Sequence, residues 1–225
     1  MNIKSLYLTL SCLVFFCVVG ASYYVLFNNF ASQEEERVAT LVVSAPLALE
    51  STDIAVNSIK LALDEVGYMA GDIRLTLRIL DDGDETGGWV AEREEENALS
   101  AAANQSTIAF IGPLNSGAAK ISMPILNKAG IAQISPSNTW PGLTKIGFTP
   151  GEPGVFYPTG VRHYVRVCTT DDLQGPAGAQ WARKLGFESV YVVDDNDAYG
   201  IGIARLFEAE AHDLGLAVIG SKSIV

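Results

Sequence analysis

The stretch IAFIGPLNSG (residues 108–117) decides the fold class of this chain, because an apolar strand pattern runs directly into small and hydroxyl-bearing residues. A second stretch of the same kind, IAQISPSNT (131–139), follows one helical segment later. In an open α/β sheet, ligands bind in the crevice beyond the carboxyl ends of the strands, where hydroxyls and free backbone N–H groups can hold a small anionic group. The two stretches therefore predict a cleft that binds a small molecule rather than transforming it.

Strand and helix patterns alternate outward from these stretches. Strands are predicted at 38–44, 73–79, 108–111 and 131–134, and helices at 55–66, 89–103 and 117–129. This βαβαβαβ order implies parallel strands and an α/β fold. Pro124 lies inside the third helical segment, and proline removes a donor and clashes with the preceding turn. We therefore expect two short helical pieces there.

Residues 140–161 interrupt this alternation, because they are rich in proline and glycine and predict a loop or an interdomain excursion. A second series follows, with strands at 163–167 and 190–193, helices at 172–185 and 199–214, and a last strand from residue 216 onward. We expect a first lobe at 33–161 and the start of a second at 162–225. The second lobe looks unfinished at Val225, which predicts a fragment or an early-terminated reading frame.

The first 32 residues differ in composition from the rest. Ser5–Phe27 carry no charge and follow a single Lys4, whereas every acidic residue comes later. The run is long enough to cross a bilayer, which takes about 20 residues, and its apolar part also fits a signal peptide cut after Ala21. Both interpretations export the remainder, which is periplasmic or extracellular and, if the segment is uncleaved, anchored to the membrane.

Composition limits the partners. The chain has 15 Lys and Arg against 26 Asp and Glu, a formal net charge of −11. Nucleic-acid binding leaves a basic electrostatic footprint, so this balance argues against such a partner. Cys168 is the single cysteine beyond the N-terminal segment, and no Cys/His spacing of a metal site occurs. We expect no intramolecular disulfide, no metal and no cofactor.

Three acidic runs need an interpretation. DDGDE (81–85) and DDND (194–197) each follow a predicted strand, and clustered carboxylates there can hold a divalent metal or accept phosphate. Acids and Asn also begin helices, where they accept hydrogen bonds from N–H groups and meet the positive end of the dipole. Because neither run has the spacing of a calcium loop, the capping interpretation is favoured. Glu92–Glu96 predicts a solvated helix face.

Three motifs occur in an order that carries a resemblance: IGPLNSGAA (111–119), ISPSNT (134–139) and DDNDAYG (194–200). Over roughly residues 38–225 the chain resembles the type I periplasmic binding proteins. Within them it is most similar to the branched-chain amino-acid (Leu/Ile/Val) substrate-binding proteins of ABC transporters. The resemblance implies two lobes, each with a parallel sheet flanked by helices, that close on a ligand.

The resemblance also implies site residues. Ser116 would donate to the ligand carboxylate, while Ser137, Asn138 and Thr139 would supply backbone groups and a hydroxyl around the charged head. Tyr199 would reach the cleft from the second lobe. The carboxylate that meets a ligand ammonium in this family would lie beyond the end of the sequence.

Structural alternatives stay open for these residues. Ser116 precedes a helical stretch and is a good N-cap, Ser135 and Thr139 are ordinary turn residues, and Tyr199 could pack at the domain edge. The sequence also departs from the family pattern in two places. Glu50 stands where an aromatic or small residue often lines the cleft, although it also reads as a solvated loop acid. The excursion at 140–161 is longer than the usual connection.

The sequence supports three functional hypotheses. The first is an extracytoplasmic solute-binding protein that captures an amino acid for an ABC permease by hinge closure. The second is a membrane-anchored sensor that uses the same cleft. The third, an enzyme, lacks support, because His163 and His212 have no catalytic signature around them and no G-x-S-x-G elbow occurs.

Overall fold

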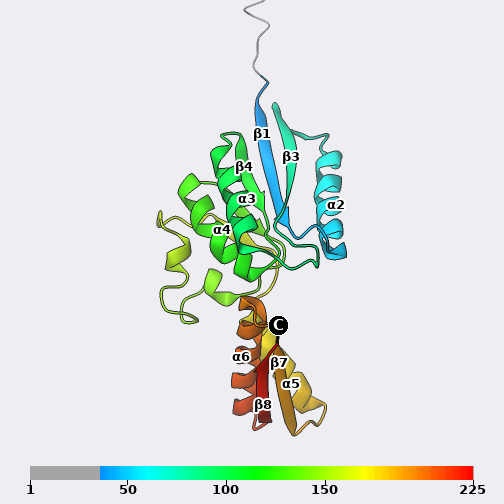
Figure 1. Cartoon of the computed structure of the whole chain (residues 1–225), viewed down its shortest axis with the longest axis vertical. Coiled ribbons are helices and arrows are strands. Elements are labelled where there is room, and N and C mark those ends of the chain that lie inside the picture. The colour runs from blue at the N-terminus through cyan, green and yellow to red at the C-terminus, as the bar shows by residue number, and fades with distance from the viewer. Residues whose placement is uncertain (1–35, 225) are drawn as a thin grey trace, which may run out of the picture. The chain divides into compact units, whose positions relative to one another are not determined.

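The computed structural model describes residues 36–224, and contacts group the chain from Val38 onward into one compact unit (Figure 1). A six-stranded sheet forms the larger part of this unit. Its strands are β1 (Val38–Ala45), β2 (Met69–Ala70), β3 (Ile73–Asp81), β4 (Thr107–Ile111), β5 (Ala132–Ser135) and β6 (Tyr164–Arg166). Neighbouring strands are parallel except for the short β2, which the sequence pattern missed and which pairs antiparallel with β3.

The strand order β2-β3-β1-β4-β5-β6 reverses direction at β1, because the chain goes first to β3 on one side and then to β4 on the other. Right-handed crossovers then put α2 (Glu50–Glu65) on one face and α3 (Ala91–Ala103) with α4 (Ser116–Ala129) on the other. Figure 1 shows α2 standing apart from α3 and α4. Such a reversal opens a crevice at the carboxyl ends of the central strands.

The core of this sheet lies between β1, β4 and the helices α3 and α4. Phe110 and Val42 are fully buried there with Ala98, Ala101 and Leu126. Strand β1 is buried along most of its length, as expected for a parallel strand that is covered on both faces. The sequence prediction of parallel strands covered by helices is confirmed.

The prediction of two helical pieces around Pro124 is wrong, because α4 is one continuous helix from Ser116 to Ala129. Its inner face buries Ala119, Met123 and Leu126 almost completely. Burial of each large apolar side chain contributes about 1.5–3 kcal/mol, which together offsets the roughly 3 kcal/mol cost of an interior proline. Tertiary packing therefore outweighs the local preference.

The predicted strand at 163–167 forms, but it does not begin the second series of strands. Strand β6 pairs in parallel with β5, at the edge of the first sheet. The misassignment has a clear reason: the long excursion suggested a change of domain, although the chain returns to the same sheet after it.

The excursion contains two short 3₁₀ helices, η1 (Pro141–Leu143) and η2 (Gly154–Phe156), and little other regular structure, as predicted. It is nevertheless packed. Trp140, Leu143, Phe156 and Tyr157 form a buried cluster with side chains of α4 and β6. The Tyr157 hydroxyl donates to the Leu143 carbonyl, which closes the loop on itself.

The remaining elements are α5 (Asp171–Lys184), β7 (Ser189–Asp194), α6 (Ala198–Asp213) and β8 (Ala217–Ser223). Strands β7 and β8 are parallel and form a separate two-stranded sheet. Ala179, Ala211 and Leu216 make a small buried cluster between this sheet and the two helices. We call this part the second lobe and the six-stranded part, with the excursion, the first lobe.

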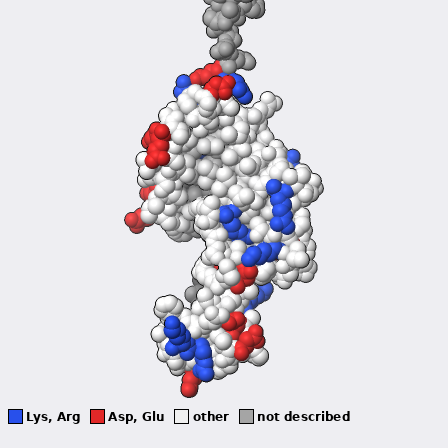
Figure 2. Space-filling model, turned by 180° about the vertical axis from the view of Figure 1, so that it is seen from behind, with Lys and Arg blue, Asp and Glu red and all other residues white. Residues whose placement is uncertain are grey.

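The predicted leader at 1–32 lies outside the described residues. Within residues 36–224, no helix is both long enough and apolar enough to cross a membrane. On the face shown in Figure 2, basic and acidic side chains lie in small separate groups around a wide uncharged area. Cys168 is a free, half-buried thiol.

Candidate functional site

A cleft opens where β1, β4 and β5 end, at the reversal of strand order. Its volume is about 480 Å³. The lining residues come from the start of α2, from the turns after β4 and β5, and from α6: Leu49, Ser51, Ile54, Ala55, Leu114, Asn115, Ser116, Pro136, Ser137, Thr139 and Tyr199. Four of the five predicted site residues therefore line one cleft, and Asn138 does not.

Ser116 is the first residue of α4, so the alternative that it caps this helix is wrong. Asn115 holds the N-cap position, and within residues 36–224 its side chain makes no capping hydrogen bond. The Ser116 hydroxyl instead accepts a hydrogen bond from the Trp140 N–H at 3.2 Å. The first N–H groups of a helix have no partner inside the helix, so this end of α4 presents donors beside the cleft.

Asn138 supports the turn and does not face the cleft, because it is fully buried and bonded within the protein. Its side-chain amide donates to the Pro113 carbonyl at 2.9 Å and accepts from the Tyr164 hydroxyl at 3.1 Å. Its backbone N–H and carbonyl are bonded to Ser135 Oγ and Arg166. Asn138 is fully buried and ties the turns after β4 and β5 together.

Ser137 is exposed at the cleft and links the same two turns. Its hydroxyl donates to the Leu114 carbonyl at 2.7 Å, and its backbone N–H donates weakly to Ser135 Oγ at 3.2 Å. The Ser137 hydroxyl oxygen keeps a free lone pair and can still accept a hydrogen bond.

Thr139 has a buried hydroxyl at the cleft. Its Oγ1 is buried and makes no hydrogen bond of good geometry among residues 36–224, although it lies near enough to the Asp171 carboxylate to lower the pKa of that group, and the residue lines the cleft. An unpaired buried hydroxyl costs about 1–3 kcal/mol. A ligand group that bonds to Thr139 Oγ1 would remove this cost.

Asp171, which the sequence analysis did not select, lies next to Thr139. Its N–H donates to the Thr139 carbonyl at 3.0 Å, and both carboxylate oxygens are buried without a hydrogen-bond partner in the described part of the chain. Burial raises the pKa of Asp171, and Thr139 and Arg166 partly oppose the increase. The only signal for Asp171 in the sequence is its position as an acid directly before a predicted helix. Such an acid is usually interpreted as interacting with the positive end of the helix dipole.

Tyr199 enters the cleft from α6, the second-lobe helix. The residue is 37% exposed, and its hydroxyl makes one long contact of 3.5 Å with the Gln174 amide. The phenol is therefore available to a ligand. Glu50, by contrast, is the exposed first residue of α2 and does not belong to the cleft lining.

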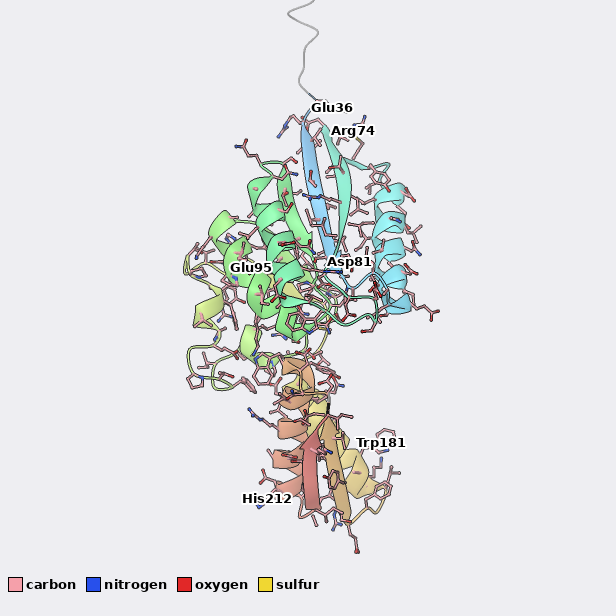
Figure 3. All side chains as sticks on the ribbon, in the orientation of Figure 1. Glu36, Arg74, Asp81, Glu95, Trp181 and His212 are labelled. Atoms are coloured by element: carbon pink, nitrogen blue, oxygen red, sulfur yellow. The ribbon has the colours of Figure 1, made fainter. Side chains whose placement is uncertain are left out.

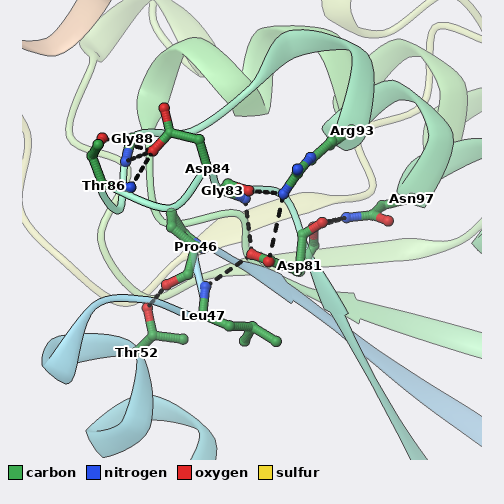
Figure 4. Close-up of polar contacts among 11 residues, drawn as sticks. Pro46, Leu47, Thr52, Asp81, Gly83, Asp84, Thr86, Gly88, Arg93 and Asn97 are labelled. Atoms are coloured by element: carbon green, nitrogen blue, oxygen red, sulfur yellow. Dashed lines mark hydrogen bonds and ion pairs between the residues drawn. The ribbon is translucent and has the colours of Figure 1, made fainter.

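The acidic run after β3 accepts hydrogen bonds that stabilise turns (Figure 4). Asp81 accepts from the N–H groups of Leu47 and Gly83, at 2.9 Å each. Asp84 accepts from Thr86 and Gly88, and these bonds lower its pKa. The carboxylates therefore stabilise the β3–α3 loop. No group of three or more metal-binding side chains occurs within residues 36–224.

The second acidic run begins α6. Asp197 is the N-cap, and its side chain accepts from the Ala198 N–H at 2.6 Å. Asp194 and Asp195 accept from the N–H groups of Asn196 and Asp197. The favoured interpretation of this run as a helix start is confirmed.

Glu94 contradicts the prediction of a solvated face at 92–96, because it is fully buried while Glu92, Glu95 and Glu96 are exposed. Ser44 donates to Glu94 Oε2 at 2.6 Å. Burial raises the pKa of Glu94 to about 8, and burial together with the nearby charge of Asp81 raises that of Asp82 to about 6. The Asp82 and Glu94 carboxyls interact. A proton shared between them supplies the hydrogen-bond donor that two ionised carboxylates would lack.

The fold and cleft define a ligand-binding lobe pair, and the family comparison agrees. The chain belongs to the receptor family ligand binding region, whose model matches residues 54–225. It is 26% identical over 171 residues to the Leu/Ile/Val-binding protein BraC3 of Rhizobium johnstonii, covering 75% of this chain and 41% of that protein. It is 32% identical over 110 residues to an amino acid binding protein of Pseudomonas aeruginosa, covering 48% and 26%.

Solved structures give the same fold. An ABC transporter substrate-binding protein from Desulfitobacterium hafniense in complex with Leu matches with a TM-score of 0.65 at 24% identity, over 84% of this chain and 51% of that one. A leucine binding protein from Thermotoga maritima matches with a TM-score of 0.64 at 23% identity, over 83% and 48%. The predicted resemblance to type I periplasmic binding proteins is confirmed. The chain spans about half the length, or less, of the relatives that it matches.

Proposed function

We propose that this protein is an extracytoplasmic solute-binding protein that captures an amino acid, or a similar small zwitterion, in the cleft beyond β1, β4 and β5. The observation that carries the proposal is the Thr139 hydroxyl, which is buried and unpartnered in the described residues although Thr139 lines the cleft. The names of the relatives, which include Leu/Ile/Val-binding and amino acid binding proteins, support the same class of ligand.

The start of α4 suits the ligand carboxylate. Several neutral donors that converge on an anion can bind it without a countercharge, and charge-assisted hydrogen bonds are about twice as strong as neutral ones. Here the donors are the first N–H groups of α4 and the hydroxyl of Ser116. The Ser116 hydroxyl is free to donate, because in the structure it only accepts.

The turn after β5 suits the ligand ammonium. Ammonium groups donate only, and Thr139 Oγ1 can accept. The unpartnered carboxylate of Asp171 lies behind Thr139 and adds a negative charge on this side of the cleft. The carboxylate of a zwitterion therefore meets neutral hydrogen-bond donors, and its ammonium meets acceptors, at neighbouring turns.

The remaining walls are apolar. Leu49, Ile54, Ala55 and Leu114 also line the cleft, and Ile54 leaves 66% of its surface exposed. No charged side chain lines this cleft among residues 36–224. These walls favour an aliphatic ligand side chain over a charged one.

Tyr199 gives the cleft a contact from the second lobe, which supports hinge closure as the mechanism. A ligand that touches both lobes favours the closed form, and an ABC permease is the partner that would receive the ligand from it. Within this proposal the protein itself catalyses no reaction.

The membrane-anchored sensor remains the alternative. It depends on residues 5–27, which lie outside the described residues, and N-terminal sequencing of the mature protein tests it. Retention of this segment keeps the sensor open, whereas a mature N-terminus at Ser22 excludes direct transmembrane signalling.

Isothermal titration of the complete protein with the twenty amino acids tests the proposed function. We expect binding of Leu, Ile or Val, and loss of about 1–3 kcal/mol of binding free energy in Thr139→Val, which keeps the shape but removes the hydroxyl. Thr149→Val, at an exposed position of the excursion, is the matched control. Binding that is equal in Thr139→Val and wild type would refute the assigned site, and no binding of any amino acid would refute the ligand class.

A further inference from the structure

A hydrogen bond connects the two lobes beside the cleft. Trp89 precedes α3 in the first lobe, and its indole Nε1 donates to Asp197 Oδ2 at 2.9 Å. Asp197 precedes α6 in the second lobe, 108 residues further along the chain. The indole N–H is a donor only, and the second carboxylate oxygen is otherwise free to accept it.

Asp197 uses its two oxygens for two different tasks. Oδ1 caps α6 through the Ala198 N–H, and Oδ2 receives Trp89. The backbone N–H of Asp197 is bonded to Asp195. Tyr199 follows two residues later, within the first turn of α6, and lines the cleft. The orientation of this turn therefore determines where the Tyr199 phenol lies.

The two lobes approach each other so closely at Gly117 that this position requires a glycine. A Cβ added at Gly117, the second residue of α4, would lie 2.5 Å from Trp89 Cζ2 and 2.9 Å from Asp197 Oδ1. The Trp89 ring, the α6 cap and the start of α4 thus meet at one point, directly beside Ser116. The lobes also touch at a second point, where a Cβ at Gly202 would lie 2.5 Å from the Trp140 ring.

The Trp89 donor is held in place before any ligand arrives. Its neighbour Val90 donates to the Asp82 carbonyl at 2.7 Å, and Trp89 forms an antiparallel bridge with Gly83. Arg93 in turn donates to the Gly83 carbonyl (Figure 4). The indole N–H therefore makes its bond with little further ordering of the loop.

We propose that the Trp89–Asp197 hydrogen bond is a latch between the lobes that positions Tyr199 in the cleft and prolongs the residence of the ligand. Trp89 is a positioning residue, because it lies outside the cleft lining and acts through Asp197. The effect on residence rests on the proposed function, whereas the latch itself does not.

Three variants isolate the latch. Trp89→Phe keeps an aromatic ring and removes the N–H. Asp197→Asn keeps one oxygen for the α6 cap and replaces the acceptor of the indole with an amide. The third variant combines both changes. Trp181→Phe is the matched control, because Trp181 projects outward from α5 and is 67% exposed (Figure 3).

Stopped-flow measurement of amino-acid binding gives the first readout. We expect the dissociation rate to rise about tenfold in each single variant, with the association rate changed less, because hydrogen bonds to charged groups are the stronger ones and affinity changes fall mainly on dissociation. The double variant should be no faster than the faster single variant. A dissociation rate in Trp89→Phe equal to wild type, or additive effects in the double variant, would overturn the proposal.

The indole N–H signals in a ¹H–¹⁵N spectrum give a readout that needs no ligand. The chain has three tryptophans, and Trp89→Phe and Trp181→Phe assign all three signals. We expect Asp197→Asn to move the Trp89 signal upfield and to speed its solvent exchange, with the Trp181 signal unchanged. An unaltered Trp89 signal would refute the latch. A wild-type protein that binds no amino acid would refute the proposed function instead, and the indole signal then decides on the latch alone.

Discussion

The two lobes bury their sheets to very different extents. In the first lobe, Val42 and Val43 of β1 are at most 3% exposed, because helices cover both faces of the sheet. In the second lobe, Tyr191 and Val193 of β7 are more than half exposed, and Ile219 of β8 is 69% exposed. The first lobe thus provides a rigid frame for three of the four predicted residues that line the cleft, while the second contributes Tyr199 from a much less buried unit. Burial and cleft-lining positions are therefore distributed unequally between the two lobes.

The largest expected effect tests this contrast directly. Phe110→Ala in the first lobe removes a fully buried ring, which should lower the free energy of unfolding by about 3–5 kcal/mol. Phe187→Ala in the second lobe removes a ring that is 55% exposed and should cost no more than about 1 kcal/mol. Urea denaturation followed by circular dichroism measures both. Equal losses would contradict the contrast between the lobes.

The next effect concerns the buried acid pair of the first lobe. The folded-state pKa values of Glu94 and Asp82 are raised, so the folded protein holds a proton that the unfolded chain has released. The contribution of the two protonated carboxyls to the free energy of unfolding is therefore complete below the unfolded pKa values near 4. It is lost as the pH rises toward 8. Stability should fall by up to about 1.4 kcal/mol per pH unit in this window for each proton involved.

Glu94→Gln tests the origin of that fall, because the amide cannot ionise. Unfolding curves between pH 4.5 and 8 should show a flatter dependence in Glu94→Gln than in wild type, with Glu95→Gln, an exposed neighbour on α3, as the control. A wild-type stability that rises over this range would contradict the assigned direction of the shifts.

A smaller effect is expected where the two strand-end turns are joined. Asn138→Ala leaves the Pro113 carbonyl and the Tyr164 hydroxyl without their partner, which should cost about 2–3 kcal/mol of stability. Ser137→Ala, one residue earlier and exposed, should cost less than about 1 kcal/mol. Thermal unfolding of the two variants compares them, and a larger loss in Ser137→Ala would refute the structural role of Asn138.

The smallest effect is expected between the excursion and α5. Lys145 pairs with Asp172 at 2.7 Å, but the lysine side chain is 43% exposed. Exposed ion pairs contribute about 0–1 kcal/mol, so Lys145→Met should change thermal stability only slightly and less at high salt. A loss above 2 kcal/mol would mean that this contact joins the two lobes far more tightly than its exposure implies.

Much of the fold was predictable because local signals agreed with packing. The strands at 38–44, 108–111 and 190–193 and the helices between them were recognised from apolar spacing and glycine stops. The two fold predictions that were wrong depended on residues distant in the sequence. The sheet to which β6 belongs and the continuity of α4 through Pro124 are decided by packing against other elements, which no local pattern contains.

The cleft was predictable in outline for a related reason. Hydroxyl residues after β4 and β5 mark strand ends, and parallel strands bring such ends together. The burial of Asn138, the unpartnered Asp171 and the bond between Trp89 and Asp197 were not predictable. Each depends on which atoms meet in three dimensions, and the sequence separates the last pair by 108 positions.

The position of Trp140 gives the protein an optical signal of its own. The residue is 7% exposed, and its ring contacts Phe148 edge to face and rests against the backbone of α6 at Gly202. The backbone N–H of Trp140 donates to the Ser116 hydroxyl at the cleft. Any movement of α6 away from the first lobe would admit water to this indole. Such a movement should therefore shift tryptophan emission to longer wavelength, so that it can be followed in unlabelled protein.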